Sequence, residues 1–98
     1  ISDASVPGMP IVFASEGFFK MTGYEPAEIL GHSLEKLYGA DSDPTTVAMI
    51  REAMETHQAV STCILNYRKD GRSFWNHLSL QPVSDSSGSL RYYVATQV

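Results

Sequence analysis

Apolar and polar residues alternate in three stretches of the second half of the chain, at about 59–68, 73–82 and 89–98. A period of two places alternate side chains on opposite faces of a strand, so the pattern predicts three β-strands, each with one face toward a core. The short polar segments between them, at 68–72 and 84–88, contain the Asp and Gly residues typical of turns. We therefore expect an antiparallel three-strand meander.

Three amide side chains occupy positions where these strands should carry apolar residues. Asn66 ends one apolar alternation, Asn76 is in phase with Phe74 and Leu78, and Gln97 lies near the chain end. A buried amide without a partner costs about 1–3 kcal/mol. Several together indicate either a flat ligand with hydrogen-bonding groups along one edge or a polar cluster that is satisfied internally or by water.

The turn between the first two strands decides whether the asparagines meet. A two-residue turn would mix the two faces of the hairpin. A three-residue loop at 69–71, with its glycine in the left-handed conformation, pairs Asn66 with Phe74 and Asn76 with Ile64. The two amides are then diagonal neighbours, with the roughly 7–8 Å spacing usual for such pairs.

The first half of the chain predicts a short strand followed by short helices. Pro10–Ala14 is apolar and strand-like, and Ser15 is a suitable N-cap for a helix that Gly23 would end. Pro26 can open a second short helix that reaches Leu30. Segment 32–38 has room for one or two further turns.

The longest predicted helix begins at Asp43-Pro44, a combined cap and first-turn signal, and extends to His57. One face of it carries an apolar stripe made of Val47, Ile50, Ala53 and Met54. Helices followed by an antiparallel meander predict an α+β fold with helices over one face of a sheet.

Composition narrows the function classes. The chain of 98 residues fits one domain, and a net charge of −4 with scattered Lys and Arg argues against nucleic-acid binding. No apolar run approaches the ~20 residues of a membrane span, so we expect no membrane contact by this domain. The single cysteine, Cys63, excludes an internal disulfide and favours an intracellular, cytoplasmic protein. The abrupt ends suggest a module excised from a larger signalling protein.

Catalytic and metal-binding roles have little support. The histidines have no spacing with one another, or with Cys63, that is typical of a metal site, and no nucleophilic triad is indicated. The phase of Cys63 places it on the outward face, as a structural thiol. The expected protein is not an enzyme.

Several segments resemble the PAS superfamily, namely Pro10–Phe19, Met21–Tyr24, Glu28–Gly31 and Asp43-Pro44. The segments Asn66-Tyr-Arg-Lys-Asp-Gly71 and Phe74-Trp-Asn76 are similar to its LOV branch, the flavin-based blue-light sensors. The resemblance implies a PAS fold over residues 1–98, with a five-stranded antiparallel sheet. The first strand would contribute only its end, near residues 1–4.

The resemblance also implies roles for individual residues. Asn66, Asn76 and Gln97 match the amides that hydrogen-bond the polar edge of the isoalloxazine ring, and Arg51 matches an arginine that contacts the flavin phosphate. Arg51 could instead form an ion pair with Glu55 one turn later, which is the interpretation we favour.

The segment Gly31–Tyr38 departs from the LOV adduct motif. Leu34 replaces the photoactive cysteine, Glu35 replaces a phosphate-binding arginine, and Tyr38 replaces a flavin-contacting glutamine. A glycine two residues before Gln97 is replaced by Ala95. The usual cysteinyl-flavin photochemistry is therefore not expected, and FMN is expected to bind weakly or not at all.

The outward face of the predicted sheet is rich in aromatic and apolar residues, including Leu65, Trp75, Tyr92 and Val94. PAS and LOV domains commonly dimerise or dock flanking helices through this face, so we expect a homodimer, or flanking helices or an effector domain of the same chain, to cover it.

The function expected from the sequence is a LOV-like regulatory module that acts through this face, with flavin binding weak or lost. The first alternative is a flavin-binding light or redox sensor that forms no adduct. A further alternative is the cytoplasmic PAS cap of an ion channel, because Leu37-Tyr38-Gly39 is similar to ether-à-go-go-type channels.

Overall fold

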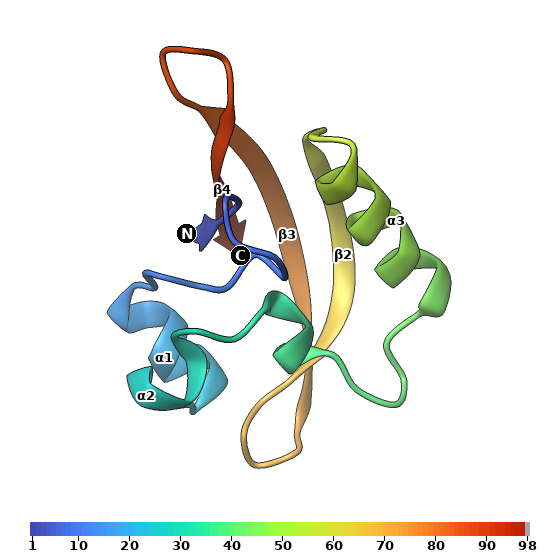
Figure 1. Ribbon diagram of the computed structural model, residues 1–98. Coiled ribbons are helices and arrows are strands. Elements are labelled where there is room, and N and C mark those ends of the chain that lie inside the picture. Colours follow the sequence, from blue (N-terminus) through green and yellow to red (C-terminus); the bar gives the residue numbers. More distant parts are fainter. Residues whose placement is uncertain (98) are drawn as a thin grey trace.

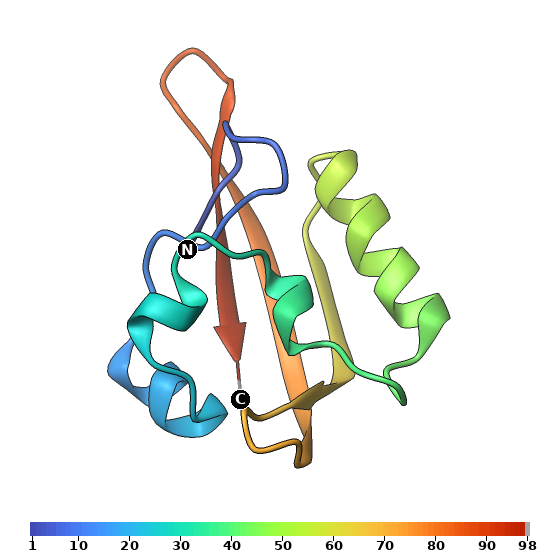
Figure 2. The same ribbon diagram turned by 60° about the horizontal axis from the view of Figure 1, so that its bottom comes forward.

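The computed structural model describes residues 1–97 and contains one antiparallel sheet with helices over one face (Figures 1 and 2). Its strands are β1 (Ser2–Asp3), β2 (Val60–Tyr67), β3 (Ser73–Ser84) and β4 (Leu90–Gln97), in the spatial order β1-β4-β3-β2. The PAS-type α+β fold is confirmed. Val98, the last residue of the strand predicted at 89–98, lies outside the described residues.

The register of the first hairpin agrees with the three-residue loop. Asn66 pairs with Phe74 and Ile64 pairs with Asn76. Gly71 has φ 90°, the left-handed conformation that a residue without Cβ adopts at low cost. The inward face of the hairpin therefore carries both asparagines.

The described sheet has four strands, where five were expected. Pro10–Ala14 forms no strand, and only an isolated bridge joins Ile11 to Ser2. Pro10 has no N–H to donate to a ladder. The N–H of Ile11 donates to the carbonyl of His32, and the carbonyl of Ile11 accepts from Gly31, so the segment after the second helix uses these groups.

The first short helix begins and ends at the expected capping residues, whereas the second ends at Ile29, one residue before the predicted Leu30. Helix α1 (Glu16–Thr22) has Ser15 as its N-cap, with Oγ accepting from Phe18 N, and ends at Gly23 with φ 77°. Helix α2 (Pro26–Ile29) opens with its proline, and the 3₁₀ turn η1 (Leu34–Leu37) follows it. None of the helices in residues 1–97 has the length and apolar character of a membrane span.

Helix α3 (Pro44–Glu55) packs beside β2 (Figure 1). Asp43 caps it by accepting from Thr45 N and Thr46 N, but the helix ends two residues before the predicted His57. His57 has φ 60°, and the next residue, Gln58, donates its N–H to Ala53 O at 2.8 Å. This is the hydrogen bond of a Schellman motif, with histidine where glycine is usual.

Two separate clusters make up the hydrophobic core. One lies between α3 and the sheet and contains Ile50, Ile64, Leu78, Leu80 and Tyr93. The other lies under α1 and α2 and contains Ile11, Ile29 and Leu37. Leu34 of η1 packs against both clusters, so it occupies the boundary between them.

Candidate functional site

The three amides lie on one diagonal across neighbouring strands. Asn66 is on β2, Asn76 is on β3 and Gln97 is on β4. Directly paired residues share a face of the sheet, and Gln97 pairs with Leu78, two residues after Asn76. All three side chains therefore arise from the inward face, as the alternation predicted.

Hydrogen bonding between the asparagines leaves half of each amide unused. Asn76 Nδ2 donates to Asn66 Oδ1 at 2.8 Å, and the two residues are only 1% and 2% exposed. Asn66 Nδ2, Asn76 Oδ1 and Gln97 Oε1 are buried and have no hydrogen-bond partner among residues 1–97. The diagonal thus presents one unused donor and two unused acceptors, each of which is costly to bury alone.

A cavity of about 540 Å³ borders this diagonal at Gln97 alone, whereas Asn66 and Asn76 are not among the residues that line it. Gln97 and Ala95 of β4, Leu34 of η1, and Phe18 and Met21 of α1 are among the residues that line it. The sequence analysis did not identify Phe18 and Met21 as lining residues. The signal that could have identified them from the sequence is their spacing of three residues on the apolar side of a short helix.

The unused groups suit a planar heterocycle. The polar edge of a flavin ring carries carbonyl oxygens that accept hydrogen bonds and an N–H that donates one. Asn66 Nδ2 can donate to such a carbonyl, while Asn76 Oδ1 can accept from the ring N–H. The unpaired buried amide atoms therefore match the hydrogen-bonding groups along the edge of a flavin ring.

A second cavity, of about 270 Å³, lies between η1 and α3 and includes Tyr38, Glu35, Arg51 and Glu55 in its lining. Leu34 lines this cavity as well as the first. Arg51 Nη2 donates to Glu35 Oε1 at 2.5 Å, so its ion-pair partner is Glu35 and not the expected Glu55. An i,i+4 pair in which the arginine precedes the glutamate has the less favourable order. The turn η1 instead positions the Glu35 carboxylate next to the Arg51 guanidinium.

The charges of this second cavity do not fit a phosphate. The hydrogen bond that Arg51 donates to Glu35, the negative charge of Glu35 and that of Glu55 raise the pKa of Arg51, whose cation is therefore already balanced. Burial, followed by the charge of Glu35, raises the pKa of Tyr38 to about 12, which keeps its hydroxyl neutral. Two carboxylates and one guanidinium leave this cavity with a net negative charge at neutral pH.

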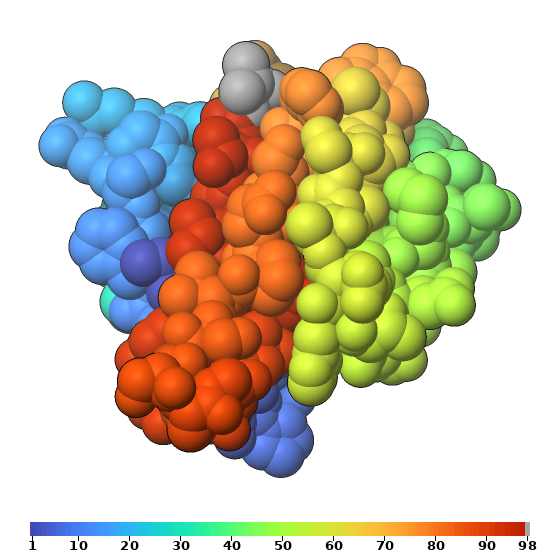
Figure 3. Space-filling model, turned by 90° about the horizontal axis from the view of Figure 1, so that it is seen from above, coloured from blue at the N-terminus to red at the C-terminus, as the bar shows by residue number. Residues whose placement is uncertain are grey.

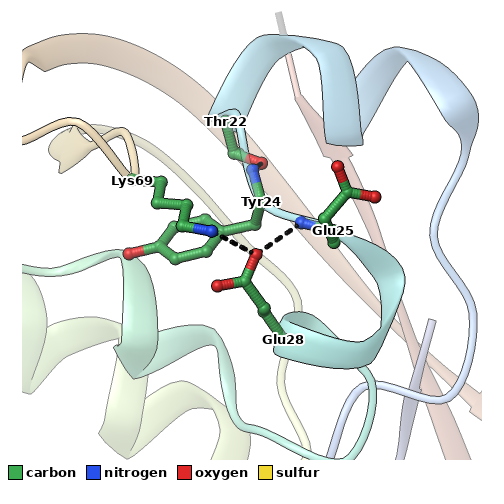
Figure 4. A network of polar contacts seen from close by, with 5 residues as sticks. All are labelled: Thr22, Tyr24, Glu25, Glu28 and Lys69. Atoms are coloured by element: carbon green, nitrogen blue, oxygen red, sulfur yellow. Dashed lines mark hydrogen bonds and ion pairs between the residues drawn. The ribbon is translucent and has the colours of Figure 1, made fainter.

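A polar network joins the β2–β3 loop to the short helices (Figure 4). Lys69 Nζ contacts Glu28 Oε1 at 2.8 Å, and the same oxygen accepts from Glu25 N at 3.0 Å. Lys69 N donates to Thr22 O at 2.9 Å. Arg68 also donates to the carbonyl of Met21, and its guanidinium lies over the Phe74 ring.

Cys63 lies away from both cavities. It is exposed on the outward face of β2, opposite His77, as its phase predicted. It lines neither cavity and is not a substitute for a thiol at position 34. Within the described part of the chain, no group of His, Cys, Asp and Glu could hold a metal ion.

Within residues 1–97 no helix covers the outward face of the sheet, and Figure 3 shows β4, β3 and β2 side by side on it. Trp75 is 72% exposed and Tyr92 is 38% exposed. Leu65 and Val94 are only half-buried, and Val94 also reaches the lining of the first cavity.

Comparisons with known proteins agree with this architecture. The sequence profile of the PAS domain family matches residues 4–98. Phototropin-2 of Oryza sativa subsp. japonica is 45% identical over the whole of this chain, which spans 11% of that protein.

Two solved LOV structures superpose closely. The light-state structure of the blue-light photoreceptor Aureochrome1 LOV is 43% identical with a TM-score of 0.96, and the alignment covers 99% of this chain and 76% of that one. A structure titled "Flavin Analogue Sheds Light on Light-Oxygen-Voltage Domain Mechanism" is 40% identical with a TM-score of 0.95, covering 99% and 72%. With this fold, this hairpin register and these similarities, the chain belongs to the LOV branch of the PAS domain family.

Proposed function

We propose that this chain is a sensory and regulatory LOV module that holds a flavin ring through Asn66, Asn76 and Gln97 and forms no cysteinyl adduct. It regulates a partner and is not itself a catalyst. Because the chain spans only 11% of rice Phototropin-2, the effector it would control is part of this proposal.

The observation that carries the proposal is the set of three buried amide atoms without partners. Two asparagines that only satisfied each other would not each leave an amide atom buried without a partner, and the third such atom, Gln97 Oε1, belongs to a residue that lines the first cavity. A bound ring would supply these missing partners and offset the cost of burying them. The adduct-free flavin sensor is therefore favoured over an interaction module with no flavin inside, which was the function favoured by the sequence alone.

The residues of the site would bind and transmit rather than react. A flavin, when bound, supplies blue-light absorption and redox chemistry. Leu34 has no nucleophilic atom, and Cys63 is on the opposite face of the sheet. Gln97 can rotate its amide to present either its oxygen or its nitrogen. A change of hydrogen bonding at the ring would therefore reach β4, whose outward side carries Tyr92 and Val94.

The test is to equilibrate the purified chain with a flavin and record its absorption in the dark and under blue light. We expect a stoichiometric blue band that light does not convert reversibly into a near-ultraviolet band. The Asn66→Leu/Asn76→Leu variant should lose the bound flavin, whereas Gln81→Leu, at an exposed amide of β3, should retain it. Failure of the parent chain to take up any flavin would refute the proposal.

A second candidate is an interaction module that works through the outward sheet face with no ligand inside. The exposure of Trp75 and Tyr92 favours it, because exposed aromatic patches commonly mark interfaces. Sedimentation of the parent and of Trp75→Ser would test this candidate, which requires a dimer or a captured flanking segment that the variant loses. The ion-channel alternative rests only on Leu37-Tyr38-Gly39, and no structural feature adds to it.

A further inference from the structure

We propose that the flavin site selects a flavin with an uncharged tail, riboflavin, over its phosphate ester FMN. The inference rests on the proposed flavin binding and concerns the second cavity, where Glu35 and Arg51 form an ion pair.

The first step of the argument concerns the cation. Arg51 is the only Lys or Arg in the lining of the second cavity, and it already donates to Glu35 Oε1 at 2.5 Å. A phosphate would have to break this contact, which would leave the Glu35 carboxylate beside the incoming negative charge. Arg51 is therefore not available as a free anion-binding group.

The second step concerns the other charged group of the lining. Glu55 also borders the cavity, so its two carboxylates outnumber the one guanidinium. A phosphate monoester carries nearly two negative charges at neutral pH. The net negative lining would repel this phosphate. Because the charged groups are solvent-exposed and screened, we expect the affinity for FMN to be about tenfold lower than the affinity for riboflavin.

The third step concerns what the cavity can accept. Ser33 and Tyr38 contribute hydroxyl groups, and Glu55 contributes carboxylate oxygens, which together can bond a chain of neutral hydroxyls. Met9, Ile50 and Met54 supply apolar walls. A polyhydroxylated, uncharged tail is complementary to this mixture.

The two cavities also share a lining residue. Leu34 lines both of them, so the ring site beside Gln97 and the charged site beside Arg51 meet at one residue. In this proposal the ring lies at the three amides and the tail extends past Leu34 into the second cavity.

The experiment measures dissociation constants of riboflavin and FMN for the ligand-free chain from the quenching of flavin fluorescence, at low and high salt. We expect riboflavin to bind about tenfold more tightly at low salt, with the difference shrinking at high salt as screening increases. Glu35→Gln should improve FMN and leave riboflavin nearly unchanged, because it frees Arg51. Glu52→Gln removes the same charge from an exposed position of α3 outside the lining and should change neither value.

The outcomes separate this inference from the proposed function. If FMN binds as tightly as riboflavin, the selectivity is refuted while flavin binding stands. If neither flavin binds, the proposed function fails and the inference fails with it. If riboflavin is preferred equally by the parent and by Glu35→Gln, the assignment to Glu35 is wrong.

Discussion

At the scale of single residues, the molecule is most unusual at Asn66 and Asn76. Both side chains are almost fully buried, and each uses one amide group on the other and leaves the second unpaired. Such a pair contributes little net stability, because each buried unpaired group offsets much of the gain from the shared hydrogen bond. A ligand that supplied the missing partners would therefore remove this cost.

This balance predicts a non-additive pair of substitutions in the ligand-free protein. Asn76→Leu alone should destabilise the chain by about 1–3 kcal/mol, because Asn66 then keeps no partner. Adding Asn66→Leu should recover most of that loss, since the buried polar atoms are then removed together. Urea denaturation measures both, with Gln81→Leu as the exposed-amide control; equal losses in the single and double variants would contradict the argument.

At the scale of elements, the ends of the helices are only partly predictable from the sequence. Ser15, Gly23 and Asp43 cap as predicted. The end of α3 differs, because His57 takes the left-handed conformation and the Tyr93 hydroxyl donates to Gln58 O at 2.9 Å, which holds the following turn against β4. This contact from the sheet holds the turn in place and so offsets the strain of a non-glycine residue in the left-handed conformation.

His57→Gly should stabilise the protein by about 0.5–1 kcal/mol, since relief of the left-handed strain exceeds the added chain entropy of glycine. Thermal or chemical denaturation would show the gain as a higher midpoint. His32→Gly is the matched control, because His32 is also exposed but its φ is not positive. That substitution should be neutral or destabilising, and an equal gain in both variants would contradict the explanation.

The contact between α2 and the β2–β3 loop should give a pH-dependent stability. Hydrogen bonds from Lys69 and from the Glu25 backbone lower the pKa of Glu28 below its ordinary 4.5. A lowered carboxyl pKa stabilises the fold above that ordinary value, and the contribution is lost as the pH falls through the folded pKa. The hydrogen bond to Glu28 likewise raises the pKa of Lys69 above 10.5, so the contact also weakens at more alkaline pH.

Thermal melts of the parent and of Glu28→Gln across the pH range check this expectation. The two should differ at neutral pH and converge below pH 4.5. Glu16→Gln, which removes an exposed carboxylate paired with Lys20, serves as the control for general charge effects. A difference that persists unchanged at acidic pH would show that Glu28 acts through packing alone.

At the scale of the whole molecule, the divided core explains why a site exists. Leu34 of η1 packs against both the cluster under α1 and α2 and the cluster under α3, and it lines both cavities. Segment 33–38 therefore lines both cavities, contributes to the charge of the second cavity and packs between the clusters.

A variant that changes this segment at three positions, Leu34→Cys, Glu35→Arg and Tyr38→Gln, should bind FMN more tightly than the parent and bleach reversibly under blue light. The thiol supplies the missing nucleophile, and the arginine replaces a repulsive carboxylate. Absorption spectra before, during and after illumination provide the measurement, and Leu34→Cys alone separates chemistry from affinity. If the triple variant still takes up no FMN, the obstacle lies outside segment 33–38.

The sequence by itself determined the three strands of the meander, the caps at Ser15, Gly23 and Asp43, the inward direction of the three amides and the register of the first hairpin, because these follow from local periodicity and turn geometry. Only the tertiary structure decided which groups meet across the fold. It paired Arg51 with Glu35, left Ile11 as a single bridge, and placed Gly39 so close to the Tyr67 ring that a Cβ would lie 2.3 Å from it. Partner choice depends on the summed packing of distant segments, which no local pattern contains.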